Sequence, residues 1–590
     1  MGENKNWILA IVLSVLIFVG FEYYWSLTRP PVPVQPNTEA QLNTNNIAKG
    51  QVQTQTPELT KPSVPTISEP RAQKLSSLEN NEAKRINVLQ ASPRVIIKTS
   101  RLNGSVSLQG GLIDDLSLVN YNNTLDEDSG NIILFSPNDS TNAYFATYGW
   151  SGNSNQKLPD SKSLWSTDGT ILSEASPLTL RWDNGAGLVF VRTYQIDSNY
   201  MFTITQSVEN NTESNVTLYP YGLIKRYGTP ETTGFYILHE GPLGVFNEQL
   251  LEVDYDDIQE KREIKEKTTG GWIGITDKYW LAALIPNQKN AVNTRFVFGK
   301  KGTLDTYQTD YLAGPIVIPA RGAKSSTSRL FAGAKEVRLL DKYEKDLDIS
   351  RFDLSIDFGW FYFLTKPIFL ALLWLQDRVG NLGVSILLLT IGIKLAFFPL
   401  ANKSYESMSK MKKLQPEMLK LRERFGDDKV KLNQEMMALY KREKANPAAG
   451  CLPILVQIPV FFALYKVLFV TIEMRHAPFF GWIRDLSAPD PTTIFNLFGL
   501  LPWTPPDFLM LGVWPLIMGL TMWLQQKLNP QPMDPTQAKI MMFLPIMFTF
   551  LLAQFPAGLV VYWAWNNVLS IAQQWVIMRR MGITSEQALK

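Results

Sequence analysis

Long apolar stretches at both ends of the chain constrain its fold more than any other feature of the sequence. Residues 7–25 form a nearly uncharged stretch of membrane-spanning length, and the last third of the chain holds several more. The first stretch is long for a secretory signal peptide, ends in aromatic residues suited to a membrane interface, and lacks a small-residue cleavage signature. The sequence therefore predicts a membrane protein with an uncleaved N-terminal anchor.

The composition excludes several classes of chemistry. With one cysteine, Cys451, and two histidines, His239 and His476, no internal disulfide and no zinc or haem ligand set is expected. No phosphate-binding loop or dinucleotide fingerprint occurs, and the net charge of +3 does not indicate a nucleic-acid ligand. We therefore expect no cofactor, no metal, no bound nucleotide, no specific nucleic-acid sequence as partner and no enzymatic activity.

Two regions of contrasting composition follow the anchor, which with its cytoplasmic tip covers residues 1–25. Residues 26–90, rich in Pro, Gln and Thr, are typical of an extended linker. Residues 91–350 alternate apolar and polar side chains between turn residues, which predicts antiparallel hairpins, including hairpins at 183–185 and 209–211. A large β-sandwich is expected. Its carboxylates have no spacing that pairs an acid with a base, which favours binding or scaffolding over catalysis.

The final region, 351–590, predicts helices, and charge places one part of it in the cytoplasm. The helices are expected at 357–376, 381–400, 452–472, 510–527, 539–555 and 558–578. Residues 401–446 hold twelve Lys or Arg against seven Asp or Glu, as cytoplasmic loops do. Apolar residues recur there every three or four positions on both sides of Gly426, which predicts a helical hairpin. Its methionines suit either adaptable contact with a partner or a self-packed seam.

A cytoplasmic 401–446 determines the rest of the topology. If residues 7–25 cross outward once, only one further crossing can precede residue 401. We assign that crossing to 381–400 and place 357–376 along the outer surface of the membrane. The next four helices also cross, which gives six spans, two cytoplasmic termini, and a location outside the cytoplasm for the linker, the β-domain and the loop 473–509. Within that loop, 492–508 is too interrupted by proline to cross and is expected at the outer interface.

Lys394 lies inside the predicted span 381–400, where snorkelling to the interface is marginal. A lysine at a span centre costs about 2.5–3.5 kcal/mol, and the five predicted spans that follow the anchor contain no acidic residue. We interpret Lys394 as a cation that faces a water-filled cavity. Lys466, nearer the outer end of its span, is expected to snorkel. The uncharged polar candidates near Lys394 are Thr390, one turn earlier, and Gln457, Gln554, Asn566, Asn567 and Gln573 on other helices.

Large apolar side chains on the proline-containing spans 452–472 and 539–555 could line such a cavity. They either pack against other helices or receive another protein's hydrophobic segment, and they are Ile458, Phe461, Phe462, Met547 and Phe548. A proton-coupled transporter with Lys394 as relay is the alternative, but it requires an intramembrane carboxylate. A Ser-Lys dyad is excluded because Ser385 lies nine residues, roughly 13 Å, from Lys394 and on the opposite helix face.

Several long motifs carry a resemblance over essentially the whole chain: "GGWIGITDKYWLAALIP", "LQPEMLKLRERFGDD", "GCLPILVQIPVFFALY", "IRDLSAPDP" and "FPAGLVVYWAWNNVLSIAQQ". They resemble the Gram-negative members of the YidC/Oxa/Alb family of membrane protein insertases. The resemblance implies a membrane α-helical bundle of six transmembrane helices, five of them forming the insertase core, with a periplasmic antiparallel β-supersandwich and a cytoplasmic helical hairpin. It also implies a groove with one basic residue. Lys394 matches that position, where many members have arginine, so the charge is kept and the planar bidentate donor is lost.

The same resemblance implies a set of site residues and partners. The groove wall and its hydrophobic slide would be formed by Lys394, Thr390, Gln457, Ile458, Phe461, Tyr562 and Trp563. The implied function is insertion and folding of nascent inner-membrane proteins, alone or with the Sec translocon. Further implied partners are the ribosome, at the hairpin and the C-terminal tail, and the membrane lipids.

Overall fold

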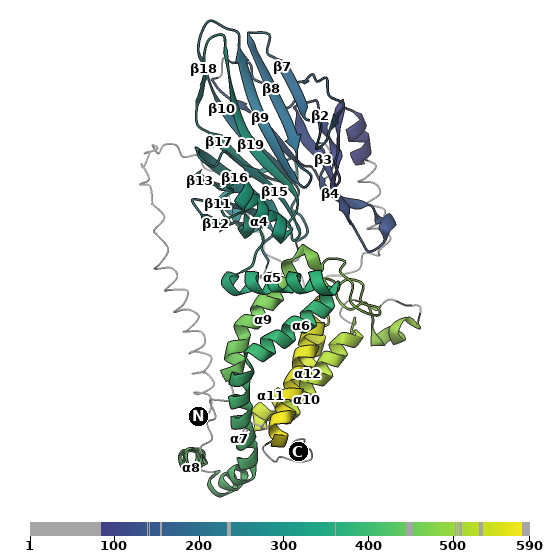
Figure 1. Ribbon diagram of the computed structural model, residues 1–590, viewed down its shortest axis with the longest axis vertical. Helices are drawn as coiled ribbons and strands as arrows, with labels where there is room; N and C mark the ends of the chain where they lie inside the picture. The colour runs from purple at the N-terminus through teal and green to yellow at the C-terminus, as the bar shows by residue number, and fades with distance from the viewer. Residues whose placement is uncertain are drawn as a thin grey trace, which may run out of the picture. The chain divides into compact units, whose positions relative to one another are not determined.

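Figure 1 shows the computed structural model of the chain. It describes residues 84–580, apart from 139, 141, 154–155, 233–237, 360, 427, 444–451, 502, 504, 507–509 and 530–534. The predicted anchor, most of the predicted linker and the C-terminal tail from 581 onward lie outside the described residues. The described residues all belong to one compact unit, Pro70–Lys590.

Two sheets make up the region after the linker, and most of their strand pairs are antiparallel (Figure 1). The 11-stranded sheet has the order β13-β16-β17-β10-β5-β3-β2-β1-β6, with β18 paired to β10 and β4 paired to β3. Its strands are β1 (Arg94–Lys98), β2 (Leu102–Ser107), β3 (Leu112–Asn122), β4 (Asn131–Phe135), β5 (Tyr144–Ser151), β6 (Ile171–Leu172), β10 (Val216–Tyr227), β13 (Glu263–Thr269), β16 (Ala291–Lys301), β17 (Leu304–Ala313) and β18 (Ile316–Ile318).

The 8-stranded sheet has the order β12-β11-β14-β15-β19-β9-β8-β7. Buried and less buried residues alternate along β8 and β9, so each strand turns one row of side chains toward the core. Phe190, Phe202 and Ile204 on these rows are fully buried. The predicted β-sandwich is therefore confirmed. The strands of this sheet are β7 (Leu178–Asp183), β8 (Leu188–Ile196), β9 (Met201–Asn210), β11 (Gly241–Phe246), β12 (Gln249–Glu252), β14 (Trp272–Thr276), β15 (Trp280–Ile285) and β19 (Gly322–Ala334).

One of the predicted hairpins is wrong. The turn at 183–185 does join two paired strands, since β7 and β8 are antiparallel neighbours. The turn at 209–211 instead joins β9 in the 8-stranded sheet to β10 in the 11-stranded sheet. Asn210 holds this crossing, because its side-chain amide donates to the carbonyls of Ser214 and Ile318 at 2.8 and 3.3 Å. Alternation identifies each strand's buried face, but it does not say which neighbour the strand pairs with.

Helices follow the sandwich, as expected from the sequence. Between α7 and α8 a self-packed seam forms, in which Leu414 and Met418 meet Met436 and Leu439. Figure 1 shows α10 beside α12, and these two helices are in extensive contact. The helices are α3 (Tyr255–Lys261, between strands of the sandwich), α4 (Val337–Asp346), α5 (Tyr362–Val379), α6 (Leu382–Ala396), α7 (Phe398–Phe425), α8 (Lys429–Arg442), α9 (Leu452–Val470), α10 (Val513–Leu528), α11 (Pro535–Leu552) and α12 (Ala557–Arg580).

The expected straight helix at 381–400 is shorter than predicted. It ends at Ala396, and the chain bends by 70° into α7. Pro399 in the first turn of α7 explains the break, because proline has no N–H to donate and restricts the residue before it. Within the described residues, no helix taken alone combines the length and apolarity of a membrane span, whereas the bent pair α6 and α7 does when taken together.

Candidate functional site around Lys394

Lys394 lies on the last turn of α6 and is half-buried between α9 and α12. Its ammonium donates to the hydroxyl oxygen of Ser570 at 2.8 Å and to the side-chain oxygen of Gln457 at 3.4 Å. None of the ion pairs among the described residues includes Lys394. The site therefore holds a positive charge that is hydrogen-bonded by neutral groups and not neutralised by a carboxylate.

A hydrogen-bond network joins the partners of Lys394 to one another. Gln457 donates through Nε2 to Oδ1 of Asn566 at 2.9 Å, and the Ser570 hydroxyl donates to the backbone carbonyl of Asn566 at 2.8 Å. Ser570 lies one turn after Asn566 on the same face of α12, so both side chains reach the pair formed by Lys394 and Gln457. The network fixes the side-chain oxygens that face the ammonium, so the position of the cation is set by three helices.

The other two polar site residues, Thr390 and Tyr562, differ in their hydrogen-bond partners. Thr390 is buried, but its hydroxyl donates to the carbonyl of Ile386 at 2.7 Å on its own helix. Tyr562 is also buried and its hydroxyl is within hydrogen-bonding range of Gln457. The structure thus brings Gln457 and Tyr562 into one network with Lys394, whereas the hydroxyl of Thr390 is engaged elsewhere.

Apolar site residues form an aromatic surface next to the polar network. The rings of Phe461 on α9 and Trp563 on α12 lie with their centroids 4.7 Å apart, and Trp563 also meets Phe548 of α11 at 6.3 Å. Ile458, one residue after Gln457, is 41% exposed. On α9 the polar Gln457 is therefore followed by the apolar Ile458 and Phe461, which brings a hydrogen-bonding group beside an apolar surface.

Ser570 and Tyr405 are members of the site that sequence reasoning missed. Tyr405 lies on α7, outside the predicted spans, and burial raises the pKa of its phenol while a hydrogen bond with Ser570 opposes that rise. A serine one turn after an asparagine on an apolar helix was a usable signal for Ser570. No comparable signal existed for Tyr405, because only the bend before α7 brings it to α12.

Lys466, which the sequence predicts to snorkel toward the outer interface, has a carboxylate partner. Its ammonium pairs with the Asp357 carboxylate at 2.6 Å, and both side chains are largely buried. Asp357 also accepts from the backbone N–H groups of His239 and Gly359 at 3.2 and 3.0 Å. This ion pair ties α9 to the segment that precedes α5, so Lys466 has a structural role but through a partner that the sequence did not reveal.

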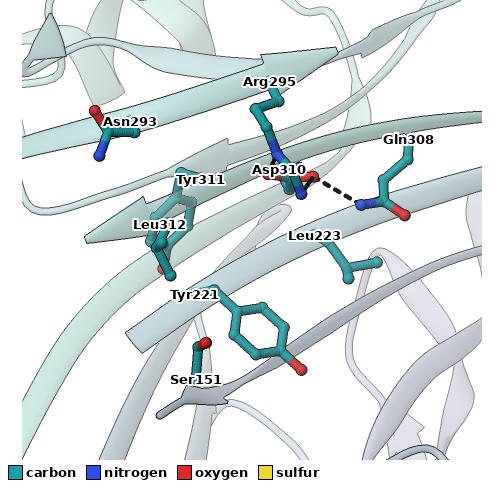
Figure 2. A pocket seen from close by; sticks show the side chains of 9 residues that line it. All are labelled: Ser151, Tyr221, Leu223, Asn293, Arg295, Gln308, Asp310, Tyr311 and Leu312. Carbon is teal, nitrogen blue, oxygen red and sulfur yellow. Dashed lines mark hydrogen bonds and ion pairs between the residues drawn. The ribbon is translucent and has the colours of Figure 1, made fainter. Parts of the chain in front are cut away.

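A concave pocket of about 420 Å³ lies on the 11-stranded sheet (Figure 2). The guanidinium of Arg295 donates two hydrogen bonds of 3.0 Å to the buried Asp310 carboxylate, and Gln308 donates to the same carboxylate at 2.7 Å. Tyr221 closes another side, over Gly149, where an added Cβ would lie 2.5 Å from the tyrosine oxygen. Asp310, the one carboxylate among the residues that line the pocket, is therefore engaged by Arg295 and Gln308.

Comparison with known families divides the chain into two parts. A model described as the YidC periplasmic domain matches residues 94–371, and one described as the 60Kd inner membrane protein matches residues 374–584. Together they define the class as an inner-membrane protein that carries a periplasmic domain ahead of its membrane part.

Individual relatives are similar over the full length. Proteins named membrane protein insertase YidC from Methylobacterium radiotolerans and Bradyrhizobium diazoefficiens are 50% and 49% identical, over 99% of this chain and 96% and 98% of their own. A solved structure described as an active YidC insertase is 17% identical, with a TM-score of 0.35, over 85% of this chain and 98% of its own. On the strength of the full-length relatives, the chain belongs to the YidC family of membrane protein insertases.

Proposed function

We propose that the protein inserts hydrophobic segments of nascent membrane proteins into the inner membrane at the site around Lys394. The observation that carries this proposal is the half-buried ammonium with hydroxyl and amide partners, Ser570 and Gln457. Because no described carboxylate neutralises it, the charge can attract the acidic or polar tail of an incoming chain. Two of its three N–H donors have partners here, which leaves one for the tail.

Water in this part of the bundle is the second element of the mechanism. An ammonium costs about 2.5–3.5 kcal/mol at the centre of a span, so it persists where water or polar groups replace bulk solvation. The partial exposure of Lys394 and the polar network of Gln457, Asn566 and Ser570 support a hydrated groove at this point. Such a groove shortens the apolar barrier that the polar tail must cross.

The hydrophobic segment of the client follows a different route from its tail. We infer that it moves along α9 and α11 into lipid, because large apolar side chains on both helices are exposed. Phe461 and Trp563 connect this route to the polar network. The exposed side chains are Ile458 and Phe462 on α9 and Ile540, Met542, Phe543, Ile546, Met547, Phe550 and Leu551 on α11.

The membrane potential supplies a driving force for the tail. Each negative charge that moves outward across an inside-negative potential of 100 mV gains about 2.3 kcal/mol, which is close to the cost of burying one charge. Insertion of a short acidic tail therefore needs no nucleotide hydrolysis by this protein.

The proposed topology has six spans with both termini in the cytoplasm, and the domain limits are those inferred from the sequence. The basic hairpin of α7 and α8 then lies in the cytoplasm, where Lys and Arg exceed Asp and Glu by twelve to seven in residues 401–446. We propose that this hairpin and the C-terminal tail meet the ribosome, and that clients arrive alone or with the Sec translocon. Membrane lipids receive the inserted helix.

Site-specific photocrosslinking to a stalled nascent chain tests this route. A photoreactive side chain at Gln457 or Trp563 is expected to capture a single-span client, because Gln457 belongs to the network and Trp563 lies on the aromatic surface next to it. Leu520 on α10 is the matched control, since it is exposed and lies on a helix outside the proposed route. Equal crosslinking at all three positions would contradict a defined path.

Reconstituted vesicles that contain only this protein test the charge. Lys394→Arg is expected to retain insertion, whereas Lys394→Ala and Lys394→Glu lose most of it, because the first keeps the cation and the others remove or reverse it. Full activity in Lys394→Glu would rule out attraction of the tail. Solute flux without client insertion would instead support the transporter alternative.

A further inference from the structure

An apolar tip protrudes from the segment between α9 and α10. We define it by its six exposed side chains, between 38 and 82% accessible: Phe495, Leu497, Phe498, Leu500, Leu501 and Trp503. Residues 491–506 contain no charged side chain at all. The tip therefore gathers six large apolar groups within nine residues, without the charged neighbours that usually accompany exposed hydrophobic residues on a water-facing loop.

The backbone of the tip is strained at two residues, and this conformation turns the apolar side chains outward. Leu497 and Phe498, in the 3₁₀ segment η5 (Ile494–Gly499), have φ values of 51° and 59°. Bulky residues rarely adopt this left-handed region, and when they do, surrounding contacts must hold them there. Phe498 N–H donates to the Thr493 carbonyl at 2.9 Å and Leu501 N–H to the Asn496 carbonyl at 3.0 Å. The turn is thus fixed with its apolar side chains outward.

The base of the tip is locked to the start of α10 by Asp490, which is 2% exposed. One carboxylate oxygen accepts from the Thr492 hydroxyl at 2.7 Å and from the Trp482 indole at 3.0 Å. The other accepts from the Trp514 backbone N–H at 2.9 Å. Gly512 makes room for this, since an added Cβ would come within 2.5 Å of the Asp490 side chain. The tip and α10 therefore move together.

Helix α10 in turn contacts the helix that carries Ser570. Asn567 on α12 donates to the Thr521 hydroxyl on α10 at 3.3 Å, and the two helices pack along their length. Any force that sets the depth of the tip consequently sets the depth of α10 and, through α12, of the polar network around Lys394.

We propose that the apolar tip inserts among the acyl chains of the outer leaflet and holds α10 at a fixed depth in the membrane. This inference rests on the proposed topology, which places residues 473–509 on the periplasmic side. Lipid is the occupant that fits, because the exposed side chains of α10 from its start to Trp523 are also apolar, namely Ile517, Leu520 and Trp523. The tip thus continues, along the chain, the surface of a helix whose proposed surroundings are lipid.

Fluorescence quenching in liposomes tests the depth of the tip. The full-length protein with Cys451→Ser receives Leu500→Cys, labelled with an environment-sensitive dye, and is reconstituted with lipids that carry a nitroxide on the acyl chain. Leu164→Cys is the matched control, because Leu164 is a leucine of the β-sandwich with 62% exposure. The Leu500 label is expected to be quenched several-fold more by the nitroxide lipid, and several-fold less by aqueous iodide, than the Leu164 label.

Iodide quenching of the Leu500 label that equals that of the Leu164 label would overturn the proposal. Shielding from iodide that disappears when the protein is diluted to one copy per vesicle would also overturn it, because a second copy would then be the occupant. Client insertion is measured in the same vesicles. Normal client insertion together with an iodide-accessible Leu500 label would refute the membrane-anchor proposal but not the proposed function. Quenching of the Leu500 label by the nitroxide lipid without client insertion would refute the proposed function but not the membrane-anchor proposal.

Discussion

Replacing Lys394 by methionine should separate the function of the site from its stability. An intramembrane lysine costs about 2.5–3.5 kcal/mol, and a hydrogen bond from a charged group returns about 1.5–3 kcal/mol. The Ser570 contact at 2.8 Å falls in that class, while the Gln457 contact at 3.4 Å is weak. The cost of the buried lysine and the gain from its hydrogen bonds cancel to within about 1 kcal/mol, so Lys394→Met should leave the free energy of unfolding nearly unchanged. Ser570 and Gln457 each keep a bond to Asn566.

Insertion should respond very differently from stability. Two unit charges 4 Å apart attract by about 4 kcal/mol at an effective dielectric constant of 20. Because Lys394 is only half-buried, we halve this figure, and about 2 kcal/mol corresponds to a roughly 30-fold slower insertion. The assay is the initial rate of insertion of an acid-tailed single-span client into proteoliposomes, with unfolding in denaturing detergent measured on the same samples.

Controls for this experiment come from the client and from the chain. A client whose acidic tail residues are replaced by their amides should be inserted equally by both proteins. Lys324→Met, which removes an exposed lysine of the β-sandwich, should change neither rate. A wild-type rate for the acid-tailed client with Lys394→Met would refute the electrostatic reasoning, as would equal slowing of both clients.

Three other predictions concern stability. Asp357→Ala should lower the free energy of unfolding by about 2–3 kcal/mol, because the largely buried Lys466 loses the Asp357 carboxylate, and Asp357→Asn with Lys466→Met should recover most of it in thermal unfolding. Gly519→Ala should lower the Tm, since its Cβ would lie 2.0 Å from the Thr549 hydroxyl oxygen, and adding Thr549→Ala should restore part of the loss. Burial raises the pKa of Glu473 to about 7, above its ordinary value of 4.5, so the folded protein binds the extra proton and the Tm should fall as pH rises between these values. Glu473→Gln should flatten that decline in a pH series of melting curves.

Local patterns in the sequence were sufficient for the sandwich and for the charge at the site. Alternation along β8 and β9 predicted both the strands and their buried faces, because the side-chain period of two is a local property. The run of apolar residues around Lys394 likewise identified it as a cation in a costly place, and Gln457 as a candidate partner. These inferences needed only residue type and spacing.

Other features depended on which segments meet in space. The β9–β10 turn crosses between sheets, and nothing in its spacing distinguishes that from a hairpin. The sequence predicts a snorkelling lysine at Lys466, and only the structure shows its ion pair with Asp357, which lies more than a hundred residues earlier in the chain. Ser570 lies 176 residues from Lys394, and its distance from the ammonium is set by the crossing of α6 and α12.

By itself, the sequence determined that this chain has a β-sandwich, apolar helices and a lysine, Lys394, inside an apolar run, since hydrophobic periodicity and charge depend only on residue type and spacing. Only the tertiary structure decided which groups share the cation, where α6 bends into α7, and how Asp490 holds the apolar tip on α10. Hydrogen bonds and ion pairs act over about 3 Å between segments that are distant in the chain, so their partners emerge only when the helices pack.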